Sequence, residues 1–307
     1  MYSVIDIGSN TVRLVIYQVE EDGRIRPMLN NKRAAGLAGY VDAEGSMRRD
    51  GVERLIGILQ EFQQILELLP DCTVFPFATA SLRNIKNTDE VLEQIRQRCG
   101  LEVQVLSGRE EAMLDFRGAI RMLGRQSGVM ADVGGGSTEV VFFRDGRVQA
   151  AGSIALGSLN LYRRYCSDIF PTEKELNAMQ KEIRSALSSA LPSVKELRTS
   201  MAVIPEPLCA IGGSARGLLS LYRQSHGSEA VSYPADYLQD LLERSRTKPK
   251  KLLRQMLQIS PDRVHTLLPG ALLLSTIAEM YGSRTILTSQ WGVREGYLES
   301  KLEAETK

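Results

Sequence analysis

The stretch Gly128-Val129-Met130-Ala131-Asp132-Val133-Gly134-Gly135-Gly136-Ser137-Thr138-Glu139 decides how this chain folds. A short apolar run ends in an aspartate and three glycines, and a second β-prone run follows from Val140 to Phe143. This pattern predicts two strands joined by a tight turn. Adjacent glycines weaken any regular element, so they make sense where the backbone must approach another group closely.

The polar groups of this predicted turn suit a phosphate and its counter-ion. Exposed backbone N–H groups at Gly134, Gly135 and Gly136 would form a concavity that accepts anions, and the Ser137 hydroxyl would add a donor. Asp132 and Glu139 would be able to hold a divalent cation against the phosphate. A glycine-rich hairpin loop without a ligand is the alternative interpretation of this stretch taken alone.

A second copy of the pattern lies near the N-terminus, in Val4-Ile5-Asp6-Ile7-Gly8-Ser9-Asn10-Thr11-Val12-Arg13-Leu14. Two such hairpins predict an internal repeat, with two similar lobes facing each other across a cleft. Each hairpin would supply one wall of a phosphate site, with Gly8, Ser9, Asn10 and Thr11 in the first lobe. Strand-like and helix-like segments alternate after it, which predicts an α/β fold. This arrangement resembles that of the superfamily of actin, sugar kinases and heat-shock proteins.

Composition excludes several classes of protein. The 307 residues carry a net charge of +1 with 43% hydrophobic and 24% charged residues, so bulk charge gives no sign of binding to nucleic acid or a membrane. Two histidines are too few for a histidine-rich metal site, and they disfavour a Ser-His-Asp mechanism. The four cysteines are scattered, as expected of reduced thiols in a cytoplasmic protein. We expect neither a signal peptide nor a membrane span.

Two adjacent glutamates open a predicted helix that begins at Ser107 and runs to about Met122. Ser107 and Glu110 form a capping box, in which the Glu110 carboxylate reaches back to the Ser107 N–H. Glu111 lies about 100° around the helix and has no part in that box. It is either a solvated partner of the helix dipole or a base that activates water against a bound phosphoryl group.

Several motifs occur in an order that resembles one family. They are Asp6-x-Gly8-Ser9-Asn10, Ala78-Thr79-Ala80-x-x-Arg83, Ser107-Gly108-x-Glu110-Glu111-Ala112, the stretch from Asp132 to Glu139, Gly212-Gly213-Ser214 and Arg294-Glu295-Gly296. Together they resemble the exopolyphosphatase and guanosine pentaphosphate phosphatase (Ppx/GppA) family over essentially the whole chain. Longer members add a helical portion similar to metal-dependent phosphohydrolases. With two histidines and no His-Asp pair, we expect the short, two-lobe form.

The resemblance implies two actin-like domains and a Mg²⁺-dependent hydrolysis of a terminal phosphoanhydride. It implies that Glu111 is the general base, that Arg83 binds phosphate, and that Asp132 and Glu139 serve the metal ion and the nucleophilic water. The predicted metal group consists of Asp132, Glu139 and Asp6. We expect the first domain over residues 1–123, with a final helix at 291–307 returning to it, and the second over 124–290. A homodimer is also expected from the family.

Two further segments have alternative interpretations. Gly213 and Ser214 follow a strand and precede a helix, so they either contact a polyanion or only form the turn that begins the helix. The run from Arg244 to Lys251 contains five basic residues. It is typical of a solvated helix face, and a track for polyphosphate is the alternative.

Three functions are compatible with these residues. The first is an exopolyphosphatase that releases orthophosphate from inorganic polyphosphate. The second is hydrolysis of guanosine pentaphosphate, which uses the same residues on another terminal phosphoanhydride. The third is a non-catalytic sensor of polyphosphate or of a guanosine polyphosphate, and the presence of Glu111, Asp132 and Glu139 argues against it.

Overall fold

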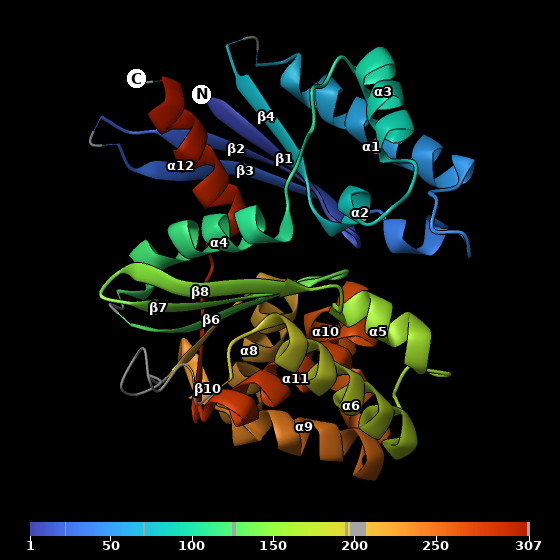
Figure 1. Cartoon of the computed structure of the whole chain (residues 1–307), viewed down its shortest axis with the longest axis vertical. Helices are drawn as coiled ribbons and strands as arrows, with labels where there is room; N and C mark the ends of the chain where they lie inside the picture. Colours follow the sequence, from blue (N-terminus) through green and yellow to red (C-terminus); the bar gives the residue numbers. More distant parts are fainter. Residues whose placement is uncertain (22, 70, 125–126, 194–195, 197–206, 306–307) are drawn as a thin grey trace. The chain divides into compact units, whose positions relative to one another are not determined.

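The computed structural model describes residues 1–305 apart from 22, 70, 125–126, 194–195 and 197–206 (Figure 1). The chain divides into two compact units. Unit 1 consists of Met1–Ser107 together with Tyr297–Lys307, and unit 2 consists of Gly108–Gly296. Each unit is built around a sheet of its own, and each is described by itself below.

The sheet of unit 1 has five strands in the order β3-β2-β1-β4-β5. Strand β1 pairs antiparallel with β2, which pairs antiparallel with β3, while β1, β4 and β5 run parallel. The strands span β1 Tyr2–Ile7, β2 Thr11–Val19, β3 Ile25–Ala34, β4 Thr73–Ala78 and β5 Gln104–Val105. The hairpin predicted from the first Asp-x-Gly turn is therefore β1–β2.

Helices cover both faces of this sheet. They span η1 Leu37–Tyr40, α1 Arg49–Leu66, α2 Ala80–Arg83 and α3 Thr88–Cys99. The apolar residues of α1 recur at helical spacing, and Leu55, Leu59 and Phe62 are fully buried against one face of the sheet. On the other face, Phe77 of β4 lies 4.7 Å from Tyr297 of α12 (Val293–Glu305), measured between ring centroids.

Unit 2 repeats this topology and adds one strand, in the order β10-β11-β9-β6-β7-β8. Strands β6, β7 and β8 are antiparallel neighbours, and β6, β9 and β11 run parallel, as β1, β4 and β5 do in unit 1. The strands span β6 Gly128–Val133, β7 Thr138–Arg144, β8 Arg147–Ile154, β9 Leu208–Ile211, β10 Ser232–Pro234 and β11 Thr285–Thr288. The shared strand order confirms the predicted internal repeat and the actin-like α/β fold.

Alternate residues of the unit 2 strands enter two different cores. In β6, Val129, Ala131 and Val133 pack in the core that the sheet forms with helices such as α6, α8 and α11. Met130 points to the other face and packs against helix α4. Figure 1 shows α4 on one side of this sheet and the remaining helices on the other. The helices of unit 2 span α4 Gly108–Leu123, α5 Ser158–Tyr165, α6 Glu173–Ala190, α8 Gly212–His226, α9 Asp236–Thr247, α10 Pro249–Ile259, η2 Pro261–Arg263 and α11 Val264–Tyr281.

Helix α4 belongs to unit 2, although the predicted domain boundary lay at its far end, after residue 123. Its buried residues Ala112, Phe116 and Ala119 pack on the unit 2 sheet, where the rings of Phe116 and Phe143 lie 5.1 Å apart. A capping motif at Ser107 shows where a helix begins, but not which sheet its apolar stripe covers. The final helix α12 begins in unit 2 and continues into unit 1.

Side-chain and backbone signals mark several ends of the helices and strands. Thr172 and Glu175 form a capping box at the start of α6, with N–H···O distances of 3.3 and 2.7 Å. Asp145 and Gly146 both take positive φ, 52° and 69°, as a tight hairpin turn requires. Asn87 does not cap α3, because its side-chain amide bonds to the Met47 backbone instead.

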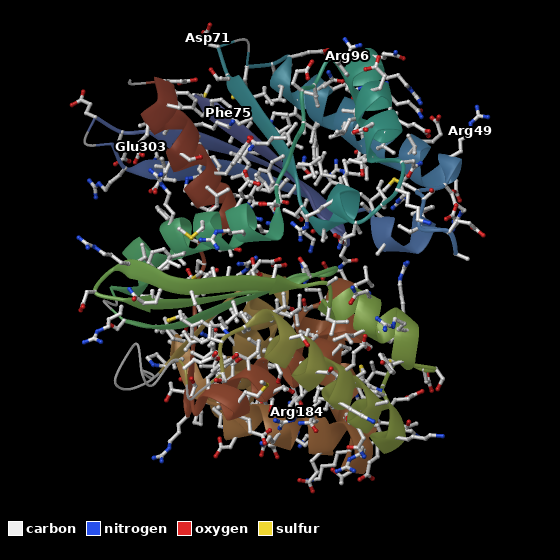
Figure 2. All side chains as sticks on the ribbon, in the orientation of Figure 1. Arg49, Asp71, Phe75, Arg96, Arg184 and Glu303 are labelled. Atoms are coloured by element: carbon white, nitrogen blue, oxygen red, sulfur yellow. The ribbon has the colours of Figure 1, made fainter. Side chains whose placement is uncertain are left out.

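The outer helix faces are charged. Arg96 on α3 pairs with Glu93 at 2.7 Å, and Arg184 on α6 pairs with Glu279 at 2.5 Å (both arginines are labelled in Figure 2). All four cysteines have free thiols. Among the described residues, the helices are too short or too polar to traverse a lipid bilayer.

Candidate active site

The glycine turn between β6 and β7 is held by the start of helix α5. The Gly134 N–H closes the turn by donating to the Ser137 carbonyl at 3.1 Å. The carbonyl oxygens of the three glycines accept hydrogen bonds from the first residues of α5. The Gly134 carbonyl accepts from the N–H and Oγ of Ser158 at 2.9 and 3.0 Å. The Gly135 carbonyl accepts from the N–H groups of Leu159 and Asn160 at 3.0 and 3.1 Å, and the Gly136 carbonyl accepts from Asn160 Nδ2 at 2.9 Å.

This arrangement fixes the direction of the N–H groups in the turn. In a trans peptide the N–H points opposite to the C=O of the same unit. Since three successive carbonyls point toward α5, the N–H groups of Gly135, Gly136 and Ser137 point away from it. Successive N–H groups on one side of a turn can form an anion-binding concavity. The sequence predicted the N–H groups of Gly134, Gly135 and Gly136 for this role, but the Gly134 N–H closes the turn, so the outward groups are those of Gly135, Gly136 and Ser137.

Helix α5 can approach the turn this closely because its cap residue is a glycine. A β-carbon at Gly157 would lie 2.5 Å from the carbonyl carbon of Gly135 and 2.6 Å from the N of Gly136. Any side chain at position 157 would therefore push the turn away from α5.

The β1–β2 turn of unit 1 has the same design. The Gly8 N–H donates to the Thr11 carbonyl at 3.1 Å. The Ser9 carbonyl accepts from the Ala38 N–H at 3.2 Å, and the Asn10 carbonyl accepts from the N–H groups of Ala35 and Gly36 at 3.0 and 2.9 Å. By the same peptide geometry, the N–H groups of Asn10 and Thr11 point away from the segment 35–38.

A row of polar side chains crosses three neighbouring strands of unit 2. Asp132 of β6 is opposite Glu139 of β7, which is opposite Ser153 of β8. Directly opposed residues place their side chains on the same face of a sheet, within about 4.5–5.5 Å at Cβ. Glu139 is 2% exposed, and its Oε1 accepts a hydrogen bond from Ser153 Oγ at 2.7 Å. The sequence therefore places Asp132 and Glu139 together, as predicted.

Helix α4 brings carboxylates to the same face of the sheet. Glu111 is 7% exposed, whereas its neighbour Glu110 is exposed to solvent. Asp115 follows Glu111 by four residues, about one helical turn, and is fully buried. The burial of Glu111 supports its assignment over Glu110, while the predicted capping role of Glu110 stays a prediction.

The four carboxylates interact electrostatically. Burial raises the pKa of Asp115 well above its usual range, and the charges of Asp132, Glu111 and Glu139 raise it further. Sequence reasoning missed Asp115. Its only local signal is a carboxylate four residues after Glu111 on a stripe that is otherwise apolar.

A group of arginines lies near Asp132. Burial lowers the pKa of Arg216 to about 10, and repulsion from Arg294 and Arg263 also lowers it. Attraction to Asp132 and Glu295 acts in the opposite direction and raises the pKa. Burial likewise lowers the pKa of Arg263. Guanidinium groups gathered at one place are typical of sites for phosphate. Sequence reasoning did not assign these arginines to the site, because they come from three separate helical segments of unit 2.

The predicted residues Gly213 and Ser214 lie at the start of α8, beside this group. A β-carbon at Gly213 would lie 2.2 Å from Cζ of Arg263, so the glycine leaves room for the guanidinium. The preceding Gly212 has φ 92° and lies against Asp132 Oδ1. Ser214 is fully buried, and its Oγ donates to Ser158 Oγ at 3.3 Å, which ties α8 to α5.

The remaining predicted residues belong to unit 1. Arg83 ends helix α2, and its Nη1 donates to the Leu106 carbonyl at 2.9 Å. Asp6 is opposite Arg13 in the strand register. The roles of Arg83 in phosphate binding and of Asp6 in metal binding stay predictions.

The carboxylates of unit 2 suit a Mg²⁺ ion that arrives with phosphate. Among the residues that the structure describes, no three His, Cys, Asp or Glu side chains form a closed metal cage. Mg²⁺ usually binds one or two protein carboxylates together with substrate phosphates and water. The opposed pair Asp132 and Glu139 fits that requirement. Asp115 fits it too, because no donor in the described part of the chain satisfies its buried carboxylate oxygens and its hydrogen-bonding neighbour is the carboxyl group of Asp132.

Comparison with known proteins shows the family of this chain. Exopolyphosphatase 1 of Mycobacterium tuberculosis is 27% identical over 311 residues, which cover 98% of this chain and 88% of that protein. A crystal structure of the Aquifex aeolicus member of the Ppx/GppA family is 26% identical, with a TM-score of 0.75 over 100% of this chain and 98% of that one. An exopolyphosphatase structure from Cytophaga hutchinsonii shares the fold, with a TM-score of 0.84 at 21% identity over 99% and 98% of the two chains. Residues 15–305 match the Ppx/GppA phosphatase family, and the chain belongs to that family.

Proposed function

We propose that this phosphatase is an exopolyphosphatase that hydrolyses the terminal phosphoanhydride of inorganic polyphosphate and requires Mg²⁺. The observation that supports it most is the composition of one face of unit 2. There the outward N–H groups of the glycine turn, the opposed pair Asp132 and Glu139, and the buried Glu111 come from adjacent elements. The name exopolyphosphatase carried by the mycobacterial relative favours polyphosphate as the substrate.

In the proposed reaction, Glu111 accepts a proton from water while the water oxygen attacks the terminal phosphorus. The bond from that phosphorus to the bridging oxygen breaks, and the shortened chain leaves with the electron pair on that oxygen. The products are orthophosphate and polyphosphate shorter by one unit. Backbone N–H groups of Gly135, Gly136 and Ser137 bind the oxygens on which charge develops. Bound Mg²⁺, held by Asp132 and Glu139, would neutralise part of that charge.

Purified protein given polyphosphate or guanosine pentaphosphate in parallel tests this function, with released orthophosphate as the readout. We expect faster release from polyphosphate. Faster release from guanosine pentaphosphate would assign the second substrate to the same residues. Binding of either compound without release of phosphate would make the chain a sensor and refute hydrolysis.

A gel of partly digested long polyphosphate tests the direction of cleavage. Attack at chain ends should yield a slowly shortening main band together with free orthophosphate. Mid-length fragments early in the reaction would contradict an exopolyphosphatase. The homodimer expected from the family and the cytoplasmic location expected from the cysteines stay predictions.

A further inference from the structure

Asp115 is a buried carboxyl group whose surroundings do not explain it. Its side chain is fully buried, and no donor in the described part of the chain satisfies its carboxylate oxygens. Its one hydrogen-bonding neighbour is the carboxyl group of Asp132, which is itself an acceptor when ionised. A buried polar group without a partner destabilises a fold. Native proteins therefore rarely keep one without a functional reason.

The charged neighbours of Asp115 make its burial less favourable still. The charges that act on it most strongly are Asp132, Glu111 and Glu139, and each of them is a carboxylate. Like charges gathered at one place repel each other, and low-dielectric surroundings strengthen the repulsion. An apolar residue would pack at this position of α4 without that repulsion, since Ala112, Phe116 and Ala119 form an apolar stripe beside it.

A cation would remove both difficulties at once. It would accept the orphaned oxygens of Asp115 as ligands and would offset the repulsion among the carboxylates. Two carboxylates with water ligands suffice for Mg²⁺ or Mn²⁺. A site with two protein carboxylates is compatible with the described side chains, among which no three His, Cys, Asp or Glu residues could hold a metal ion together.

We propose that Asp115 is a ligand for a divalent cation of the Mg²⁺ and Mn²⁺ class, which it binds together with Asp132. This inference rests on the proposed function for the identity of the metal, and it adds a residue that the sequence motifs did not mark. With Asp115 beside Asp132, two carboxylates of the protein hold the cation before any phosphate substrate arrives.

The test is Mn²⁺ binding to the full chain without substrate. Binding is measured by titration calorimetry and by the loss of the electron spin resonance signal of free Mn²⁺. Asp115→Asn keeps the shape of the side chain and removes its charge. We expect it to weaken Mn²⁺ binding by about 10- to 100-fold, the range known for groups that support a metal site. Glu110→Gln is the matched control, because it makes the same chemical change on the exposed side of the same helix. It should leave Mn²⁺ affinity within about twofold of the unaltered protein.

Thermal unfolding supplies a second readout. In excess chelator, Asp115→Asn should unfold at about the same temperature as the unaltered protein, because the amide keeps the shape of the buried side chain. Added Mn²⁺ should raise the melting temperature of the unaltered protein more than that of the variant. Should Asp115→Asn fail to fold, Asp115→Ala takes its place in both measurements.

Equal Mn²⁺ affinity in Asp115→Asn and in the unaltered protein would overturn the inference. Phosphate release measured on the same preparations separates it from the proposed function. Hydrolysis of polyphosphate together with Mn²⁺ binding that is independent of Asp115 would refute only the inference. Binding that depends on Asp115 in a protein that releases no phosphate would refute only the proposed function.

Discussion

The two glycine hairpins share a backbone and differ in charge. Both turns close through one hydrogen bond of 3.1 Å, from Gly8 to Thr11 in unit 1 and from Gly134 to Ser137 in unit 2. Both follow an aspartate at the end of a central strand. The residue opposite that aspartate is Arg13 in unit 1 and Glu139 in unit 2.

This difference shows how one repeat can serve two purposes. In unit 1 a cationic residue stands opposite the aspartate in the strand register, so the first hairpin lacks an opposed pair of carboxylates at this position. Two opposed carboxylates repel each other, and in unit 2 they are joined by Glu111 and Asp115. Under the proposed function, the second hairpin is therefore the one that would hold the cation.

The largest expected effect is the loss of the metal ion. Excess chelator should reduce phosphate release below detection, because a polyanion cannot be cleaved readily among uncompensated carboxylates. Restoring Mg²⁺ should restore the rate in a phosphate-release assay. Full activity in chelator would show that the carboxylates of unit 2 work without a cation.

Replacing the proposed base comes next. Glu111→Gln keeps the shape of the side chain and should lower turnover roughly 10²–10⁴-fold, with little change in substrate binding. Glu110→Gln, one residue away and exposed, should keep most of the activity. If Glu110→Gln alone abolished hydrolysis, the base would be misassigned. If both variants kept full rates, Glu139 would be the first alternative.

The third prediction compares the two aspartates directly. Asp132→Ala should lower turnover at saturating Mg²⁺ by roughly 10²–10³-fold, because it removes charge stabilisation at the metal. Asp6→Ala should have a smaller effect, since Arg13 lies opposite Asp6 and the carboxylate row is absent from that part of unit 1. Steady-state rates of phosphate release over a Mg²⁺ titration measure the loss of turnover in each variant. Equal losses would indicate that both hairpins hold the metal.

A pair of Gly→Ala substitutions gives the smallest effects. Gly157→Ala forces a β-carbon against the glycine turn of unit 2 and should destabilise the protein by about 1–3 kcal/mol. Gly57→Ala in α1 meets open space and should stabilise it by about 0.5–1 kcal/mol. Denaturant unfolding measures both changes. An unaffected Gly157→Ala variant would mean that the contact between α5 and the turn is dispensable.

Local patterns account for individual elements and for one pair of candidate site residues. The helical spacing of Leu55, Leu59 and Phe62 is typical of α1, and the β-prone run from Thr73 is typical of β4, because such signals lie within a few residues of each other. Asp132 and Glu139 were found together for the same reason, since a tight hairpin brings its two flanks into register. Where a side chain had a choice of distant partners, as Asn87 did with Met47, local rules failed.

The sequence by itself determined the repeat and the two glycine hairpins, and it predicted different roles for Glu110 and Glu111. Each of these depends on neighbours along one strand or one helical turn. Only the tertiary structure decided that α4 packs on the second sheet, which places Asp115 among Asp132 and Glu139. It likewise gathered Arg216, Arg263 and Arg294. These groupings depend on strand order and helix packing between segments far apart in the chain, and no local period encodes them.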